Sequence, residues 1–166
     1  MSEPDLGDIV RNVHRRYPTG VSVVTVMASD GKPYGLAVNS FSSVSLDPPL
    51  ILFAVNVSAS SYPWMFAADH MAVNVLSTSQ TAVVKRFSRS GGDKFADVDW
   101  TTGETGSPLI KGCTGRFELA VRYKIPAYTH TIIIGEVVNA EYTDDPPMIY
   151  LGGAFYDSGD LTPTEG

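Results

Sequence analysis

The stretch GLAVNSFSSVSLDPPLILF, from Gly35 to Phe53, joins two different kinds of β-sequence. Its second half leads into LILFAV from Leu50 to Val55, which is apolar throughout, as in a strand covered on both faces. Its first half belongs to an expected strand from Tyr34 to Val44, which carries an asparagine and several serines. The residues LDPP from Leu46 to Pro49 form a stiff corner, because proline fixes φ and lacks an amide donor. We therefore predict two strands, one of them unusually polar.

The polar strand is a candidate binding surface. Strand alternation places Asn39, Phe41, Ser43 and Ser45 on one face and Ser40, Ser42 and Val44 on the other. Amide and hydroxyl groups held on a strand offer fixed donors and acceptors to a planar heterocycle or a phosphate. A solvated edge strand, whose hydroxyls face water, explains the same composition equally well.

Short helices separate further strands on both sides of this segment. Apolar residues at spacings of three and four predict a helix from Leu6 to Tyr17, which Pro18 ends. Short helices are also expected at Ser60–Asp69 and Ser79–Phe87. The other expected strands are Val21–Ala28, Met71–Leu76, Arg116–Lys124, Thr129–Tyr142 and Met148–Phe155. This irregular order favours a closed or half-closed antiparallel barrel over a doubly wound sheet.

Length and charge indicate one globular domain of 166 residues with a formal net charge of -6. The basic residues form no run, so we expect no binding to nucleic acid or anionic lipid. The N-terminus, MSEPDLGDIV, lacks the features of a signal peptide, and no apolar stretch approaches the roughly 20 residues of a membrane helix. We expect one domain over residues 1–160, a disordered tail over 161–166, and a cytoplasmic location.

Motifs of several enzyme classes are absent from the sequence. Cys113 is the only cysteine, which excludes an intrachain disulfide, a cysteine metal cluster and a CxxC pair. His14, His70 and His130 show no HxH or HExxH spacing, so no metal site is expected. Without a GxSxG motif, Ser40 is not predicted to be a hydrolase nucleophile. Without Walker or Rossmann glycines, a nicotinamide cofactor would have no domain of its own.

Several segments, in order, resemble the flavin reductase-like family, which includes the small reductase components of two-component flavin monooxygenases. They are YPTGVSVVT (Tyr17–Thr25), GLAVNSFSSVSLDPPLILF (Gly35–Phe53), AVNVL (Ala72–Leu76), Arg86-Phe87 with Asp93–Phe95, GSPLI (Gly106–Ile110) and HTIIIGEV (His130–Val137). The resemblance runs from about Tyr17 to Phe155. It implies a mainly β fold with short helices, the FMN-binding split β-barrel, which forms a homodimer with the flavin near the subunit interface.

The resemblance also implies a flavin site on the polar strand and the nearby helices. It places Val38, Asn39 and Ser40 along the isoalloxazine, and Ser43, Val44 and Ser45 at the ring edge and ribityl chain. It places Ser60, Arg86 and Phe87 near the flavin phosphate, where a cation and helix-start amides suit an anion. Without the resemblance, Arg86 would be interpreted as a surface cation near the negative end of a helix.

A nicotinamide site is implied at Pro18, Thr19, Gly20 and His130. Gly20 permits close backbone approach, although an ordinary turn would also use a glycine. In the family the histidine usually ends a Gly-Asp-His triplet, whereas this chain has Tyr128-Thr129-His130. The change adds bulk where the nicotinamide should stack and removes an acid that could orient the imidazole. Hydride transfer requires no side-chain acid or base, so no catalytic residue is obligatory, and His130 is a candidate for positioning.

The function implied is an NAD(P)H:flavin oxidoreductase that reduces FMN or FAD with NADH or NADPH and supplies reduced flavin to a partner oxygenase. The altered triplet leaves an alternative, a flavin- or haem-binding split-barrel protein without nicotinamide-dependent activity. An oxidase, or a reductase of another acceptor such as a corrinoid or ferric chelate, is a third. Tyr62, Trp64 and Phe66 on one short helix also favour association with a second copy.

Overall fold

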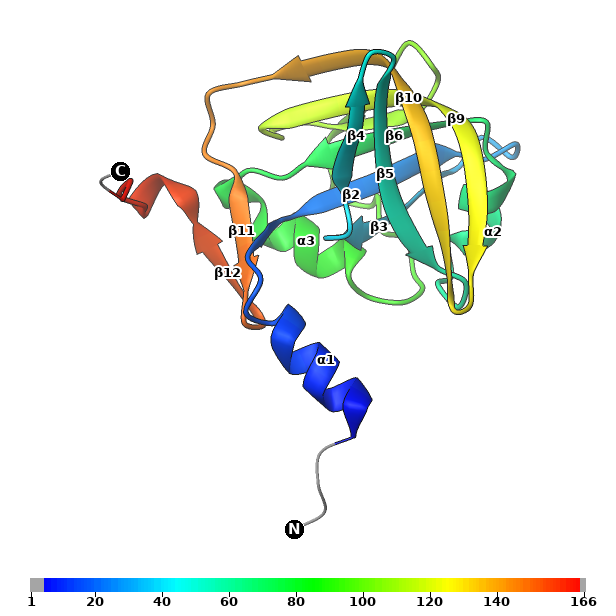
Figure 1. Cartoon of the computed structure of the whole chain (residues 1–166). Coiled ribbons are helices and arrows are strands. Elements are labelled where there is room, and N and C mark those ends of the chain that lie inside the picture. Colours follow the sequence, from blue (N-terminus) through cyan, green and yellow to red (C-terminus); the bar gives the residue numbers. More distant parts are fainter. Residues whose placement is uncertain (1–4, 165–166) are drawn as a thin grey trace.

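The computed structural model describes residues 5–164, and its largest element is a seven-stranded antiparallel sheet that curls into a barrel (Figure 1). The strand order is β3-β2-β6-β9-β10-β5-β4. The strands are β2 (Ser22–Met27), β3 (Pro33–Val38), β4 (Ser42–Leu46), β5 (Pro49–Asn56), β6 (His70–Val75), β9 (Gly115–Ala127) and β10 (His130–Tyr142). The mainly β fold expected from the sequence is confirmed.

The remaining elements surround this barrel. The helices are α1 (Leu6–His14), α2 (Tyr62–Ala67) and α3 (Thr81–Phe87), with short 3-10 turns η1 (Thr78–Gln80) and η2 (Ser158–Asp160). The short strands are β1 (Thr19–Gly20), β7 (Trp100–Thr102), β8 (Pro108–Ile110), β11 (Met148–Leu151) and β12 (Ala154–Asp157). The β7–β8 hairpin was not predicted, because a strand of three residues leaves too little alternation to recognise.

The predicted strand from Tyr34 to Val44 is wrong, since the chain breaks it at Asn39–Phe41. β3 ends at Val38 and β4 begins at Ser42, and the two strands lie at opposite edges of the sheet. A register shift between Ser43 and Ser45 also interrupts the alternation expected within β4. Residues 39–41 therefore connect the two edge strands of the curled sheet, and we call the opening between these edges the split. The local sequence pattern does not reveal that the chain crosses from one edge to the other.

The predicted strand from Met148 to Phe155 is also wrong, because it is a hairpin of β11 and β12. Its turn contains Gly152 and Gly153, with φ values of 65° and 96°. Consecutive residues in this left-handed region favour glycine and reverse the chain. The hairpin pairs with β1 and stands beside the barrel (Figure 1).

Two apolar clusters hold the fold together. Phe53, Met71, Leu119 and Ile133 lie inside the barrel, and Leu76, Phe87, Ile110 and Met148 lie between the sheet and α3. β2 supplies Val24 and Val26 to the first cluster and Val23 to the second, so it is covered on both faces, as predicted.

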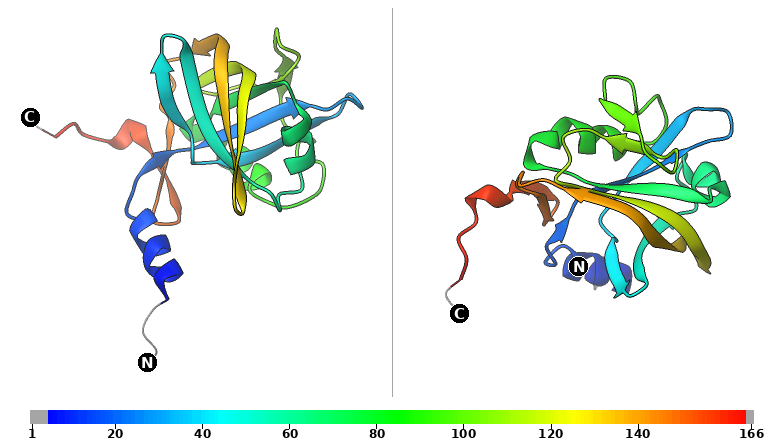
Figure 2. Two further views of the ribbon diagram at one scale, coloured as in Figure 1. Left: turned by 45° about the vertical axis from the view of Figure 1, so that its right-hand side comes forward. Right: turned by 90° about the horizontal axis from the view of Figure 1, so that it is seen from above.

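α1 projects from the barrel in Figure 1 and in the left view of Figure 2, and none of its residues is buried. It ends at His14 rather than Tyr17. Among the described residues no helix has the length and apolarity needed to cross a bilayer. Residues 161–164 of the expected tail form no helix or strand, and residues 165–166 lie outside the described part.

Candidate functional site

The split in the barrel contains a pocket of about 220 Å³ between the end of β3 and β5. We call it the split pocket; it is lined by Leu36, Ala37, Val38, Asn39, Ser40, Ala54, Asn56 and His130. The Ser40 hydroxyl ties its two sides together, since it accepts the Ala54 amide at 2.9 Å and donates to the Ala54 carbonyl at 3.1 Å. Three expected flavin residues and the expected nicotinamide residue His130 therefore share one pocket.

A second pocket, of about 190 Å³, lies on the other side of Val38 and Asn39. This hairpin pocket is lined by Val21, Ala37, Val38, Asn39, Val84, Ser88, Tyr150 and Phe155. Thr19 and Gly20 pair with Tyr150 and Ile149, next to this pocket in sequence and in the sheet, but Pro18, Thr19 and Gly20 line neither pocket. The Thr19 hydroxyl is buried and has no hydrogen-bond partner among the described residues.

Ser43, Val44 and Ser45 line neither pocket, because β4 continues away along β5. Ser43 pairs with Ile51 and Ser45 with Leu50, and the Ser45 hydroxyl accepts the Asp47 amide at 3.2 Å. These three residues border the same split from the neighbouring edge strand.

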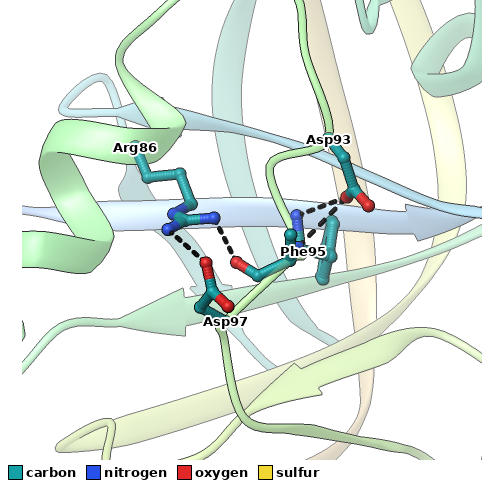
Figure 3. A network of polar contacts seen from close by, with 5 residues as sticks. Arg86, Asp93, Phe95 and Asp97 are labelled. Carbon is teal, nitrogen blue, oxygen red and sulfur yellow. Dashed lines mark hydrogen bonds and ion pairs between the residues drawn. The ribbon is translucent and has the colours of Figure 1, made fainter.

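Ser60 lines a larger pocket at the start of β3, and Arg86 lines another along α3 and the loop after it; neither residue lines the split pocket. The Ser60 hydroxyl accepts the Gly91 amide at 3.3 Å. The Arg86 guanidinium donates to the Ala96 carbonyl and to the Asp97 carboxylate, the latter at 3.1 Å (Figure 3). Arg86 therefore holds the loop that follows α3, with its guanidinium already paired.

Phe87 lies in the core rather than on a pocket wall. Its side chain is buried, packs against Gly35 and meets Phe95 edge to face at 5.1 Å. An added Cβ at Gly35 would lie 2.7 Å from Cε1 of Phe87, so the ring occupies the space that a side chain at 35 would need. The buried Phe87 ring thus packs against β3 at Gly35.

Lys94 is a site residue that sequence reasoning gave no role, although it stands in the quoted Asp93–Phe95 segment. Its Nζ donates to the Gly35 carbonyl at 3.2 Å and to the Phe87 carbonyl at 3.3 Å. Burial lowers the pKa of this ammonium from its ordinary value. The lysine places a cation between β3, α3 and the loop after α3.

The altered triplet is accommodated without blocking the split pocket. Tyr128 adopts a φ of 51°, in the left-handed region that favours glycine, and its side chain is fully exposed in the turn between β9 and β10. The Thr129 hydroxyl lies 2.9 Å from Nδ1 of His130. Threonine can therefore orient the imidazole, and the tyrosine ring does not fill the pocket.

The chain matches the model of the flavin reductase like domain over residues 14–159. It is 44% identical over 145 residues to the FMN reductase (NADH) SmoA of Agrobacterium fabrum, covering 87% of this chain and 82% of that protein. It is 41% identical to a flavin reductase of Pseudomonas putida, covering 86% of this chain and 85% of that protein. Some relatives are longer: the chain covers 47% of a probable flavin reductase of Rhizobium meliloti.

The fold is similar to that of the NADH:FAD oxidoreductase SgcE6 of Streptomyces globisporus, solved in complex with NAD and FAD fragments. The TM-score is 0.86 at 38% identity, over 94% of this chain and 96% of that one. The family expected from the residues is confirmed. By sequence and by fold, this chain belongs to the flavin reductase-like family.

Proposed function

We propose that the protein is an NAD(P)H:flavin oxidoreductase that reduces FMN or FAD by hydride transfer. The observation that supports this most directly is the convergence of Val38, Asn39 and Ser40 with His130 in the split pocket. Relatives named as NADH-dependent FMN and FAD reductases support the same reaction.

The residues at the end of β3 fit a planar heterocycle. The split and hairpin pockets share Ala37, Val38 and Asn39, so this strand end is open to a ligand on two sides. The exposed Asn39 amide offers both a donor and an acceptor. The Ser40 hydroxyl is occupied by Ala54, so Ser40 fixes the width of the split and leaves ligand recognition to its neighbours.

Bound flavin supplies the hydride-acceptor chemistry, and the chain supplies orientation. His130, held by Thr129, forms one wall at which a nicotinamide can be positioned. Thr19 and Gly20 pair with β11, whose Tyr150 lines the hairpin pocket, and this pairing supports the nicotinamide role proposed for Pro18 to Gly20.

We further propose a partner oxygenase that receives the reduced flavin. A relative 36% identical to this chain is named as the reductase component of a flavin-dependent trigonelline monooxygenase of Acinetobacter baylyi. A homodimer and a cytoplasmic location belong to the same proposal. The uncovered apolar face of α1 supports the homodimer.

Anaerobic stopped-flow mixing tests the proposal. Protein with FMN or FAD is mixed with NADH or NADPH, and loss of the oxidised flavin absorbance is followed. We expect rapid reduction in the native protein and at least a tenfold lower kcat/KM in His130→Ala. His14→Ala, an exposed change on α1, is the matched control and should reduce flavin normally. Flavin that stays oxidised with both donors would refute the proposal, and tight flavin binding without turnover would favour the non-enzymatic alternative.

A further inference from the structure

Asn56 is a polar residue of the split pocket that no sequence motif singles out. It is the last residue of β5, and it is half-buried. β5 and β10 run side by side to this end of the barrel (Figure 1), where Asn56 pairs directly with His130. Side chains that pair in this way lie on the same face of a sheet, with Cβ atoms about 4.5–5.5 Å apart. Asn56 and His130 are therefore neighbours in the lining of the pocket.

The side-chain amide of Asn56 has a fixed orientation. Its Oδ1 accepts the backbone amide of Ser58 and the Ser58 hydroxyl, both at 2.8 Å. A backbone N–H is always a donor, so the atom that it contacts must be the oxygen of the side chain and not the nitrogen. The NH2 group, in contrast, has no acceptor among the described residues. Asn56 thus offers a ligand in the pocket a hydrogen-bond donor.

The imidazole of His130 is held in a complementary way. Its Nδ1 lies 2.9 Å from the Thr129 hydroxyl. When Nδ1 carries the proton and donates it to this hydroxyl, Nε2 keeps its lone pair and is an acceptor. Within the part of the chain that the structure describes, Nε2 has no hydrogen-bond partner. Asn56 and His130 together therefore present one donor beside one acceptor.

The rest of the split pocket leaves polar recognition largely to this pair. Its lining contains no Asp, Glu, Lys or Arg. The Ser40 hydroxyl is occupied by the backbone of Ala54, and Asn39 is shared with the hairpin pocket. A neutral pocket with one donor beside one acceptor suits an uncharged group that carries a carbonyl oxygen next to an N–H. We call such a group an amide edge.

We propose that Asn56 and His130 together recognise the amide edge of a bound ring. Asn56 donates to its carbonyl oxygen, and Nε2 of His130 accepts from its N–H. Two hydrogen bonds to one edge fix the rotation of the ring in its own plane, and hydride transfer depends on such orientation. The inference rests on the proposed function and adds Asn56 as a residue that determines specificity. The nicotinamide carboxamide and the pyrimidine ring of a flavin both carry an amide edge.

Asn56→Asp tests the donor. Aspartate keeps an oxygen for Ser58, so the turn after β5 is retained, but it replaces the NH2 group by a second acceptor. Asn12→Asp makes the same chemical change at an exposed position of α1 and is the matched control. Two quantities are measured for each protein. They are the flavin Kd, from fluorescence titration, and kcat/KM for NADH at saturating flavin without oxygen.

The two sources of the amide edge give different results. If the edge belongs to nicotinamide, Asn56→Asp lowers kcat/KM for NADH by about tenfold or more and leaves the flavin Kd within about twofold of native. If it belongs to the flavin, the flavin Kd rises by about tenfold or more and kcat/KM stays near native. Either result supports the inference, provided that Asn12→Asp behaves like the native protein. A change in neither quantity, or an equal loss in both, overturns it.

Donor and flavin analogues test the acceptor. The reduced acetylpyridine analogue of NADH keeps the carbonyl oxygen and has a methyl group in place of the carboxamide NH2, and N3-methyl FMN likewise lacks the N–H of the flavin edge. In the arm that responds, Asn56→Asp should weaken the natural cofactor and its analogue by the same factor. His130→Ala should weaken the natural cofactor about fivefold more than the analogue. Equal effects of His130→Ala on both contradict the pair.

Failure of this inference is distinguishable from failure of the proposed function. Native protein that reduces flavin while Asn56→Asp matches Asn12→Asp overturns the role of Asn56 and leaves the oxidoreductase intact. Native protein that leaves flavin oxidised refutes the oxidoreductase, and the flavin titration, which needs no turnover, still decides whether Asn56 contacts the flavin.

Discussion

Glu118 is only 3% exposed in the sheet, and both oxygens of its carboxylate accept hydrogen bonds. It accepts the amides of Glu104 and Thr105 at 3.2 and 2.8 Å, the Thr105 hydroxyl at 2.7 Å and the Asn139 amide at 3.2 Å. Burial alone would raise the pKa of Glu118, but these hydrogen bonds outweigh it and lower the pKa below its ordinary value. The residue anchors the turn between β7 and β8 to the barrel.

Because the pKa of Glu118 is lowered in the folded protein, this residue makes the protein less stable in acid. The unfolded chain binds a proton at Glu118 at higher pH than the folded protein does, so the free energy of unfolding rises with pH between the two pKa values. We expect the contribution of Glu118 to the free energy of unfolding to be complete above about pH 5. It is lost as the pH falls through the folded-state pKa, which lies below the unfolded value of roughly 4.3. Glu118→Gln should lower the free energy of unfolding at pH 7 by about 1–3 kcal/mol. The reason is that the glutamine NH2 group, itself a donor, then faces donors that bind a carboxylate oxygen in the native protein.

Urea unfolding between pH 3 and 7 measures this prediction. Glu136→Gln is a suitable control, because Glu136 pairs with the half-exposed Arg122 on the barrel surface. The prediction fails if Glu118→Gln shows the same acid dependence as the native protein.

At the scale of elements, the split pocket depends on one hydroxyl that joins two strands which are not neighbours in the sheet. Ser40 follows β3, and its two bonds to Ala54 hold β3 against β5. Ser42 carries the same hydroxyl two residues later, but it donates only to the adjacent Ser43 carbonyl at 3.2 Å. The two serines therefore have different structural roles.

Ser40→Ala should loosen the split and weaken flavin binding. We expect a stability loss of about 1–2 kcal/mol from the two hydrogen bonds, and a flavin Kd that rises at least fivefold in fluorescence titration. Ser42→Ala, the matched control, should leave both quantities close to native. Equal flavin affinities of the two variants would show that the bridge does not shape the site.

For the whole molecule, the outstanding feature is an apolar surface that the chain itself does not cover. Leu6, Ile9, Val10, Val13 and Tyr17 form one stripe on and after α1, with exposures from 45% to 71%. An isolated helix of nine residues is only marginally stable in water, so this helix gains from a partner surface. Trp64 and Tyr62, in contrast, pack largely within the chain, against Tyr34 and Thr131, and provide less of such a surface than expected.

We expect the stripe to pack against a second copy of the chain. Sedimentation velocity at micromolar concentration should give a dimer for the native protein and a monomer for Ile9→Glu. Asn12→Glu introduces the same charge on the same helix away from the stripe and should remain dimeric. A native protein that sediments only as a monomer would exclude the homodimer.

The sequence alone determined the family, the mainly β class and most strand positions. Apolar runs such as Leu50–Val55 and the β-branched stretch at Val21–Ala28 carry their own signal, because alternation and burial are local properties of a strand. The order of the quoted segments likewise identified the family without coordinates. Asn39, Ser40 and His130 could be named as candidates for the same reason.

Only the tertiary structure decided where the candidate site residues lie relative to one another. It brings His130 to Val38–Ser40 through the pairing of β10 with β5, and it sends Ser43–Ser45 to the opposite edge of the sheet from β3. It also buries Phe87 and exposes Tyr128. These outcomes depend on contacts between residues far apart in the chain, and a sequence pattern, which reports only on near neighbours, does not contain them.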